Sequence, residues 1–191
     1  MKLQHALKEW AGVCLALAEG RQPLILRKGG IAEPGGEFEP EHRRFWLYPT
    51  YTHQQIEGIK PEDASFLARA ESERPSAGIV RLSHFAEVAG VYHAHDLVPV
   101  LMLGHLHTLS EDVVRARFAY RTPGIYVLAL RVYQSQQTFD VPETLVYAGC
   151  RTWVELEQPL PTEGAAPIVS DADFCDLVRT LDTILNPTAL A

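Results

Sequence analysis

The segment that most constrains the fold is GIYVLALRVY, at residues 124–133. Both its odd and its even positions are apolar, whereas a strand with one wet face alternates apolar and polar residues. A strand of this composition must be covered on both faces. The run therefore predicts a central, buried strand of a sheet, with other elements packed on each side of it.

Other segments carry strand and helix signals in mixed order. Strands are expected at 23–27, 45–51, 78–92 and 144–156, the last as a strand pair or one bent strand. Pro49 cannot donate to a ladder, so its strand should end there or lie along an edge. Helices are expected at 61–73, 110–118 and 170–185, and along an apolar stripe of Leu3, Leu7, Trp10, Cys14 and Leu17.

These elements follow one another without a regular strand–helix–strand repeat, which favours an α+β protein over a doubly wound sheet. The expected architecture is a mixed or mainly antiparallel sheet, or a small β-barrel, flanked by about four or five helices. A chain of 191 residues suits one ordinary core. We expect a main domain at 1–158, a linker at 159–169 and a C-terminal helix at 170–187 that docks on the main domain.

Charge is distributed unevenly along the chain. The formal net charge of -7 argues against a protein that coats nucleic acid by charge alone. Residues 1–60 hold 8 basic and 7 acidic residues, whereas residues 141–191 hold 2 basic and 8 acidic residues. Any anion-binding site is therefore expected in the first part of the chain.

Apolar runs and cysteine positions indicate the compartment. No run approaches the roughly 20 apolar residues that span a bilayer, and Lys8 and Glu9 stand where a signal peptide needs apolar residues. Cys14, Cys150 and Cys175 are isolated, which gives neither a disulfide set nor a CxxC metal spacing. We expect a cytoplasmic protein with reduced thiols, no membrane association and no cofactor.

Four blocks of sequence are distinctive: LILRKGGI at 24–31, FWLYPTYTHQ at 45–54, YVLALRVY at 126–133 and YAGCRTWVEL at 147–156. With them the chain resembles the bacterial family known as domain of unknown function 1802, over about residues 3–157. That family has no activity to carry over, so the resemblance implies organisation rather than chemistry. The order of FAEVAGVY, a helix and YVLALRVY is also similar to the small β-barrels of the ASCH and PUA-like group, which implies a link to RNA or nucleotides.

The first candidate site is the segment 27–54, which combines cations with aromatic side chains. Stacking on aromatic rings accepts any base, and arginine pairs with phosphate through two hydrogen bonds. A glycine pair can let backbone amides approach an anion, although no P-loop or GxGxxG pattern is present. The alternative places the aromatic residues in the core and the arginines on a solvated rim. The candidate ligand-binding residues are Arg27, Lys28, Gly29, Gly30, Arg43, Arg44, Trp46, Tyr48, Tyr51, His53 and Gln54.

The second candidate site consists of two histidine pairs, His93 with His95 and His105 with His107. Residues two apart share a face of a strand, so each pair can offer two nitrogens to one metal ion such as zinc. If 97–106 is helical, the pairs diverge, because residues two apart do not face each other on a helix. Surface or capping histidines are therefore favoured over a metal site.

Patterns of hydrolytic enzymes are lacking in the sequence. It contains no acid–x–Lys triplet of the kind that ends many nuclease motifs, and no GxSxG elbow. The sequence thus favours a non-catalytic binding module for a nucleotide or single-stranded nucleic acid over an enzyme. Two alternatives stay open: a metal-dependent hydrolase or phosphodiesterase that uses the paired histidines, and a structural module for a protein partner.

Overall fold

The apolar run at 124–133 forms the first part of a long strand in the computed structural model, which describes residues 2–28, 42–52, 54, 56–147 and 152–186. In this strand, β5 (Ile125–Pro142), every residue from 125 to 132 is buried. It pairs antiparallel with β2 (Leu24–Arg27) on one side and with β4 (Ile79–Ala94) on the other. The predicted burial on both faces is confirmed.

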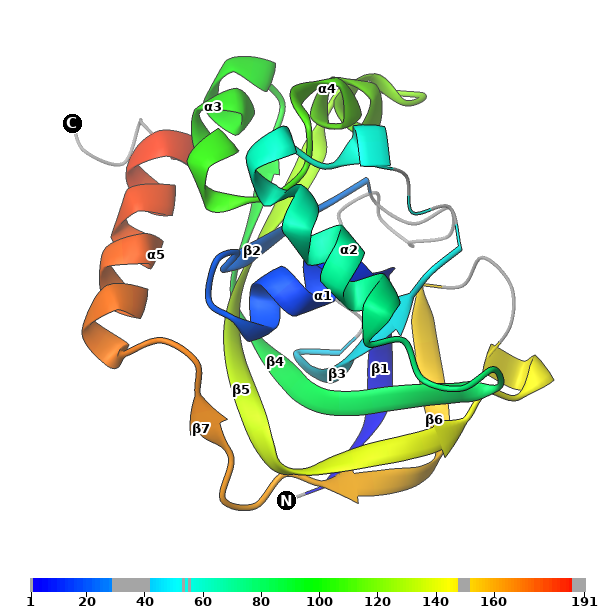
Figure 1. The fold of residues 1–191 in the computed structure, drawn as a ribbon. Helices are drawn as coiled ribbons and strands as arrows, with labels where there is room; N and C mark the ends of the chain where they lie inside the picture. The colour runs from blue at the N-terminus through cyan, green and yellow to red at the C-terminus, as the bar shows by residue number, and fades with distance from the viewer. Residues whose placement is uncertain (1, 29–41, 53, 55, 148–151, 187–191) are drawn as a thin grey trace.

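The sheet of the described residues has seven strands and is mixed, in the order β2-β5-β4-β3-β1-β6, with β7 paired to β5. The strand β3 (Arg44–Thr50) runs parallel to β1 (Lys2–Trp10), and β6 (Trp153–Pro161) runs antiparallel to it. The short β7 is Ala166–Pro167. Figure 1 shows that the sheet curls strongly without closing into a barrel. The predicted α+β class is confirmed.

Five α-helices flank this sheet within the described part of the chain. Figure 1 shows α1 and α2 together in the hollow of the sheet, α3 and α4 at one end, and α5 at the side of β4 and β5. They are α1 (Ala11–Ala18), α2 (Ala64–Ser72), α3 (Leu97–Met102), α4 (Glu111–Ala119) and α5 (Asp171–Leu185). Short 3₁₀ turns lie at Ile56–Gly58, Pro61–Asp63, Leu103–Leu106 and Leu145–Tyr147. In the described residues, no helix is both long and apolar enough to span a membrane.

Helix starts follow the capping signals of the sequence. The side chain of Ser110 accepts a hydrogen bond from the Val113 amide, and that of Ser170 accepts one from the Asp173 amide, at 3.1 Å. Such caps satisfy amides that the first turn leaves unpaired. On α5, Leu181 is fully buried, and Leu177 and Ile184 pack against the same core.

The expected helix through the first residues is wrong in its first half. Residues 2–10 form β1, and the helix begins only at Ala11. Ala6 packs in one hydrophobic cluster and Leu7 in another, on opposite faces of the strand. Apolar residues on both faces, together with a register shift between Leu3 and His5, imitate the three- and four-residue steps of a helix.

The region around 144–156 also differs from the expected strand pair. It begins with the 3₁₀ turn at Leu145–Tyr147, residues 148–151 lie outside the described part, and β6 starts at Trp153. Residues 159–161 end β6, and β7 lies further along the segment that we expected to be a linker. The division into a main domain, a linker and a docked helix stays a prediction.

Pro49 has no backbone N–H group, and it lies where β3 is paired on one side only. The strand β3 lies inside the sheet, but β4 pairs only with its residues 44–46, so Pro49 has the paired strand β1 on one side only. This half-edge position fits the expectation that the strand ends or borders an edge near the proline.

Candidate functional site

The predicted ligand-binding segment 27–54 divides between the core and the surface. Trp46 and Tyr48 are 0% and 1% exposed, so both rings belong to the hydrophobic core. The Trp46 indole donates to the Leu3 carbonyl, and the Tyr48 hydroxyl donates to Glu143, at 3.4 Å. These aromatic rings support the sheet rather than offer a stacking surface.

The other described members of that segment have separate roles. Gln54 accepts a hydrogen bond from the Gly12 amide at 2.8 Å and so fixes the segment to the start of α1. Arg43 is exposed, and Arg44 forms an ion pair with Glu87 at 3.2 Å. The Tyr51 ring is half-buried beneath the Arg74 guanidinium. The predicted residues Gly29, Gly30 and His53 lie outside the described residues.

Arg27 bridges the gap that the curled sheet leaves open. It lies at the end of β2, and its Nη2 donates to the Lys8 carbonyl of β1 at 2.6 Å, although β1 and β2 are not paired in the sheet. The same nitrogen lies 3.1 Å from the carboxylate of Glu9, whose side chain is only 5% exposed. Glu9 also accepts a hydrogen bond from the Trp10 amide, at 2.9 Å.

A second arginine reaches the same place from α4. The Arg117 guanidinium lies over the Trp10 ring, 5.3 Å from its centroid, and donates to the Leu26 carbonyl at 3.0 Å. Burial lowers the pKa of Arg117, whereas the nearby carboxylate of Glu9 raises it. The guanidinium stays charged, since an arginine pKa lies far above neutral pH.

Lys28 fixes the end of α4 beside this pair. Its ammonium group donates to the carbonyls of Phe118 at 3.0 Å, Gly124 at 2.7 Å and Thr122. A cation at the C-terminal end of a helix also meets the negative end of the helix dipole. Burial lowers the pKa of Lys28.

These side chains form one group, which we call the opening cluster: Glu9, Trp10, Arg27, Lys28 and Arg117. Its three cations and one carboxylate leave a net charge of +2. Arg27 Nε is buried and has no hydrogen-bond partner among the described residues. A buried N–H group without an acceptor costs free energy, and a bound oxyanion would remove that cost.

Three members of the opening cluster were not predicted as site residues. Glu9 and Trp10 fell on the supposed amino-terminal helix, and Arg117 falls on α4, far from the segment 27–54 in sequence. One signal was available for Glu9, because a carboxylate inside an apolar strand is rarely buried without a charged partner. For Arg117 the sequence offers no comparable signal.

The histidine pairs do not come together. The His93 and His95 rings lie 3.9 Å apart at the end of β4, and His93 stacks on Tyr126. Residues 97–106 are helical, which is the condition under which the pairs diverge, and His107 is buried at 2% exposure. In the part of the chain that the structure describes, no three His, Cys, Asp or Glu side chains gather to hold a metal ion.

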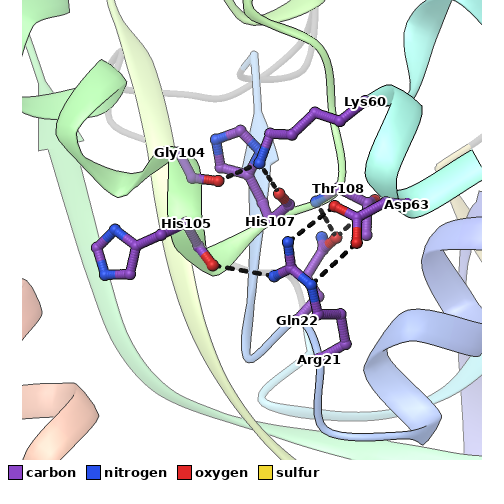
Figure 2. A network of polar contacts seen from close by, with 8 residues as sticks. All are labelled: Arg21, Gln22, Lys60, Asp63, Gly104, His105, His107 and Thr108. Atoms are coloured by element: carbon purple, nitrogen blue, oxygen red, sulfur yellow. Dashed lines mark hydrogen bonds and ion pairs between the residues drawn. The ribbon is translucent and has the colours of Figure 1, made fainter.

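A second polar group surrounds His107 (Figure 2). Arg21 pairs with both carboxylate oxygens of Asp63, at 3.0 and 2.8 Å, and also donates to the His105 carbonyl. Lys60 donates to the carbonyls of Gly104 and His107. Gln22 accepts two hydrogen bonds from Thr108. We call these residues the Lys60 network: Arg21, Gln22, Lys60, Asp63, His107 and Thr108.

The Lys60 network holds the turn after α1 against the segment before α4. Burial, together with the positive charges of Lys60 and Arg21, lowers the pKa of His107 to about 4, so the ring is neutral near pH 7. Neither ring nitrogen of His107 has a hydrogen-bond partner in the described residues. The network joins segments distant in sequence and carries the signs of a structural element.

Comparison with known proteins identifies the family of the chain. The family model described as "Domain of unknown function (DUF1802)" matches residues 6–180. The family predicted from the sequence is confirmed, and the match extends beyond the expected end near residue 157 into α5. No curated protein matches the chain.

Several solved structures resemble this one. The crystal structure of ASCH from Zymomonas mobilis is similar with a TM-score of 0.43 and 16% identity, over 92% of this chain and 93% of that chain. A serine-to-alanine mutant of that protein gives a TM-score of 0.44 and 14% identity, over 92% and 94% of the two chains. Both of these structures are of ASCH from Zymomonas mobilis.

Proposed function

The chain belongs to the family described as domain of unknown function DUF1802, and we propose that it binds a nucleotide or single-stranded nucleic acid by its phosphate groups at the opening cluster. The observation that carries the proposal is the buried Nε of Arg27 without a partner, beside a second arginine in a group of net charge +2. We expect this binding to occur in the cytoplasm.

Phosphate suits the donors that the opening cluster offers. A guanidinium presents parallel N–H groups that match two phosphate oxygens, and such charge-assisted hydrogen bonds are among the stronger ones in proteins. Arg27 and Arg117 are held in place by carbonyl groups and by the Trp10 ring, so binding orders few side chains. Preorganised donors of this kind raise affinity because less conformational freedom is lost.

The carboxylate of the opening cluster favours binding over catalysis. Glu9 is occupied by Arg27 and by the Trp10 amide, so it is not available as a general base. Two arginines contact only one or two phosphates, and the net charge of -7 repels a longer polyanion. A short single strand or a nucleotide therefore fits better than a duplex.

The test is a binding titration with a fluorescently labelled single-stranded hexanucleotide at two salt concentrations. Arg27→Gln and Arg117→Gln should each weaken binding by about tenfold and lower the salt slope by about 1, because each removes one phosphate contact. The matched control is Arg115→Gln, on the same helix, whose arginine pairs at the surface with Glu111. Equal weakening by all three variants, or none by the first two, would contradict the proposal.

A further inference from the structure

A second feature of the fold is a half-open cavity of about 220 Å³ lined by residues of α1, α2, β3 and β4. Its wall toward the helices is apolar and includes Cys14, Leu15 and Ala70. Its other wall carries polar groups from Tyr51, Ser83 and His84. Apolar walls with a few convergent polar groups are typical of sites for small organic ligands.

An irregularity in the pairing of β4 with β5 lies at two of those polar groups. Ser83 and His84 are consecutive and both line the cavity, whereas neighbours in a regular strand point to opposite faces. The register shifts there, because Leu82 pairs with Phe139 while His84 pairs with Gln134. Bulges of this type re-aim side chains beside functional sites. The sheet thus departs from regular geometry at the point where the cavity needs polar atoms.

The two side chains are paired with each other. Ser83 Oγ lies 2.9 Å from His84 Nδ1, and no other described residue forms a hydrogen bond with the second ring nitrogen of His84. Burial lowers the pKa of His84, so its ring is neutral near pH 7 and offers one donor and one acceptor nitrogen. This end of the cavity can exchange hydrogen bonds with a ligand in both directions.

Tyr51 provides an aromatic wall that is held in place. The Arg74 guanidinium lies 4.4 Å from the centroid of its ring, which limits the motion of the ring. Burial raises the pKa of Tyr51, so the hydroxyl group keeps its proton and can donate. A fixed aromatic ring beside polar groups suits a planar ligand that stacks.

Charge around the cavity excludes a phosphate. Arg81 lines the cavity but is paired with Asp140 through two hydrogen bonds, at 2.7 and 2.8 Å. Arg74 is paired with Glu71, and Glu73, which also lines the cavity, lies 3.9 Å from Arg69, which in turn pairs with Glu19. These three cations and four carboxylates give the region a net charge of -1, opposite in sign to the opening cluster.

We propose that this cavity binds an uncharged heteroaromatic ring with the hydrogen-bonding groups of a nucleobase. Its volume is below the range of about 300–1,000 Å³ of drug-sized ligand sites, which fits one ring system rather than a whole nucleotide. The choice of a nucleobase rests on the proposed function. The two sites flank the start of α1, since Trp10 belongs to the opening cluster and Ala11 lines the cavity.

The experiment titrates the full chain with uncharged nucleosides and with pyrophosphate, followed by protein-observed NMR. Nucleosides should bind, and Tyr51→Leu and Ser83→Ala should each weaken that binding by about tenfold or more. The matched control Tyr120→Leu removes an exposed tyrosine far from the lining and should leave binding unchanged. Because Ser83→Ala removes only one oxygen, thermal unfolding should show it folded.

Pyrophosphate separates the two proposals. It should lose affinity in Arg27→Gln but not in Ser83→Ala, whereas nucleosides should show the reverse. A folded protein that binds no nucleoside at millimolar concentration overturns the cavity proposal, and so does nucleoside binding that survives Tyr51→Leu and Ser83→Ala. Either result leaves the proposed function to be judged by the hexanucleotide and pyrophosphate titrations alone.

Discussion

The opening cluster and the Lys60 network both place arginine and lysine against carboxylates and carbonyls, but they differ in how completely the arginine donors are used. In the Lys60 network, Arg21 uses Nε and both terminal nitrogens for Asp63 and the His105 carbonyl. In the opening cluster, Arg27 Nε is buried and unpaired. A satisfied arginine indicates a structural contact, and an unsatisfied one indicates a place for a ligand.

The balance of charge points the same way. In the Lys60 network, Arg21 pairs with Asp63, whose side chain is 5% exposed, so these two charges cancel. Lys60 donates to backbone carbonyls instead of a carboxylate. In the opening cluster Lys28 is capped by carbonyls in the same way, and two arginines remain for the single carboxylate of Glu9. If the two groups differ in this way, substitutions in the Lys60 network should change stability, and substitutions in the opening cluster should change ligand binding.

The largest effect is expected from Asp63→Ala in the Lys60 network. It removes the carboxylate partner of Arg21 and should lower the free energy of unfolding by about 3–4 kcal/mol, in the lower part of the range for a buried pair, because the guanidinium left uncompensated is 30% exposed. Urea denaturation at pH 7 measures this. The control is Glu111→Ala, whose exposed pair with Arg115 should be worth less than about 1 kcal/mol. Similar losses of unfolding free energy in both variants would contradict the structural role of the Lys60 network.

A somewhat smaller effect is expected from the pH dependence of stability. The pKa of His107 is about 4 in the folded protein, below the ordinary value of 6.5. Between these values the unfolded chain binds a proton that the folded protein does not, so stability should fall by about 3 kcal/mol as pH drops from 6.5 to 4. Above pH 6.5 the contribution is constant.

His107→Leu isolates this contribution. The variant should lose less stability than the wild type between pH 6.5 and 4, since its side chain takes up no proton in either state. His84, whose pKa burial also lowers, produces a decrease of the same sign that both proteins retain. Parallel stability curves for the two proteins, measured by urea denaturation at each pH, would show that folding does not lower the pKa of His107.

Much of the fold could be predicted where a local pattern decides the structure. The two-sided apolar run of β5 and the serine caps at Ser110 and Ser170 are local signals, and the structure confirms them. The strand β1 was missed because its partners β3 and β6 lie about 40 and 150 residues away, and pairing with them overrides the helical spacing. Local periodicity could not show that.

The candidate site was harder to predict for a related reason. Composition places Trp46 and Arg27 in one aromatic and basic segment, but it does not tell which side chain faces the core and which faces the gap of the curled sheet. Arg27 and Glu9 meet only because the sheet curls until β2 lies near β1. Curling of a sheet depends on many strands together, so its consequences are not local.

The smallest effect on stability, and the sharpest test of the comparison, is expected from replacing one arginine in each region by lysine. Arg27→Lys keeps the positive charge near Glu9 but removes the unpaired Nε, so stability should change by about 1 kcal/mol. Binding of the labelled hexanucleotide should nevertheless weaken about tenfold, because lysine cannot present parallel donors to a phosphate.

Arg21→Lys is the matched control for that substitution. It makes the same chemical change in the Lys60 network, where it breaks the two-oxygen pairing with Asp63, so it should lower stability more than Arg27→Lys and leave hexanucleotide binding unchanged. Urea denaturation and fluorescence anisotropy at low salt measure the two quantities on the same preparations. If Arg27→Lys binds as the wild type does, charge alone explains the affinity, and the unpaired donor has no part in recognition.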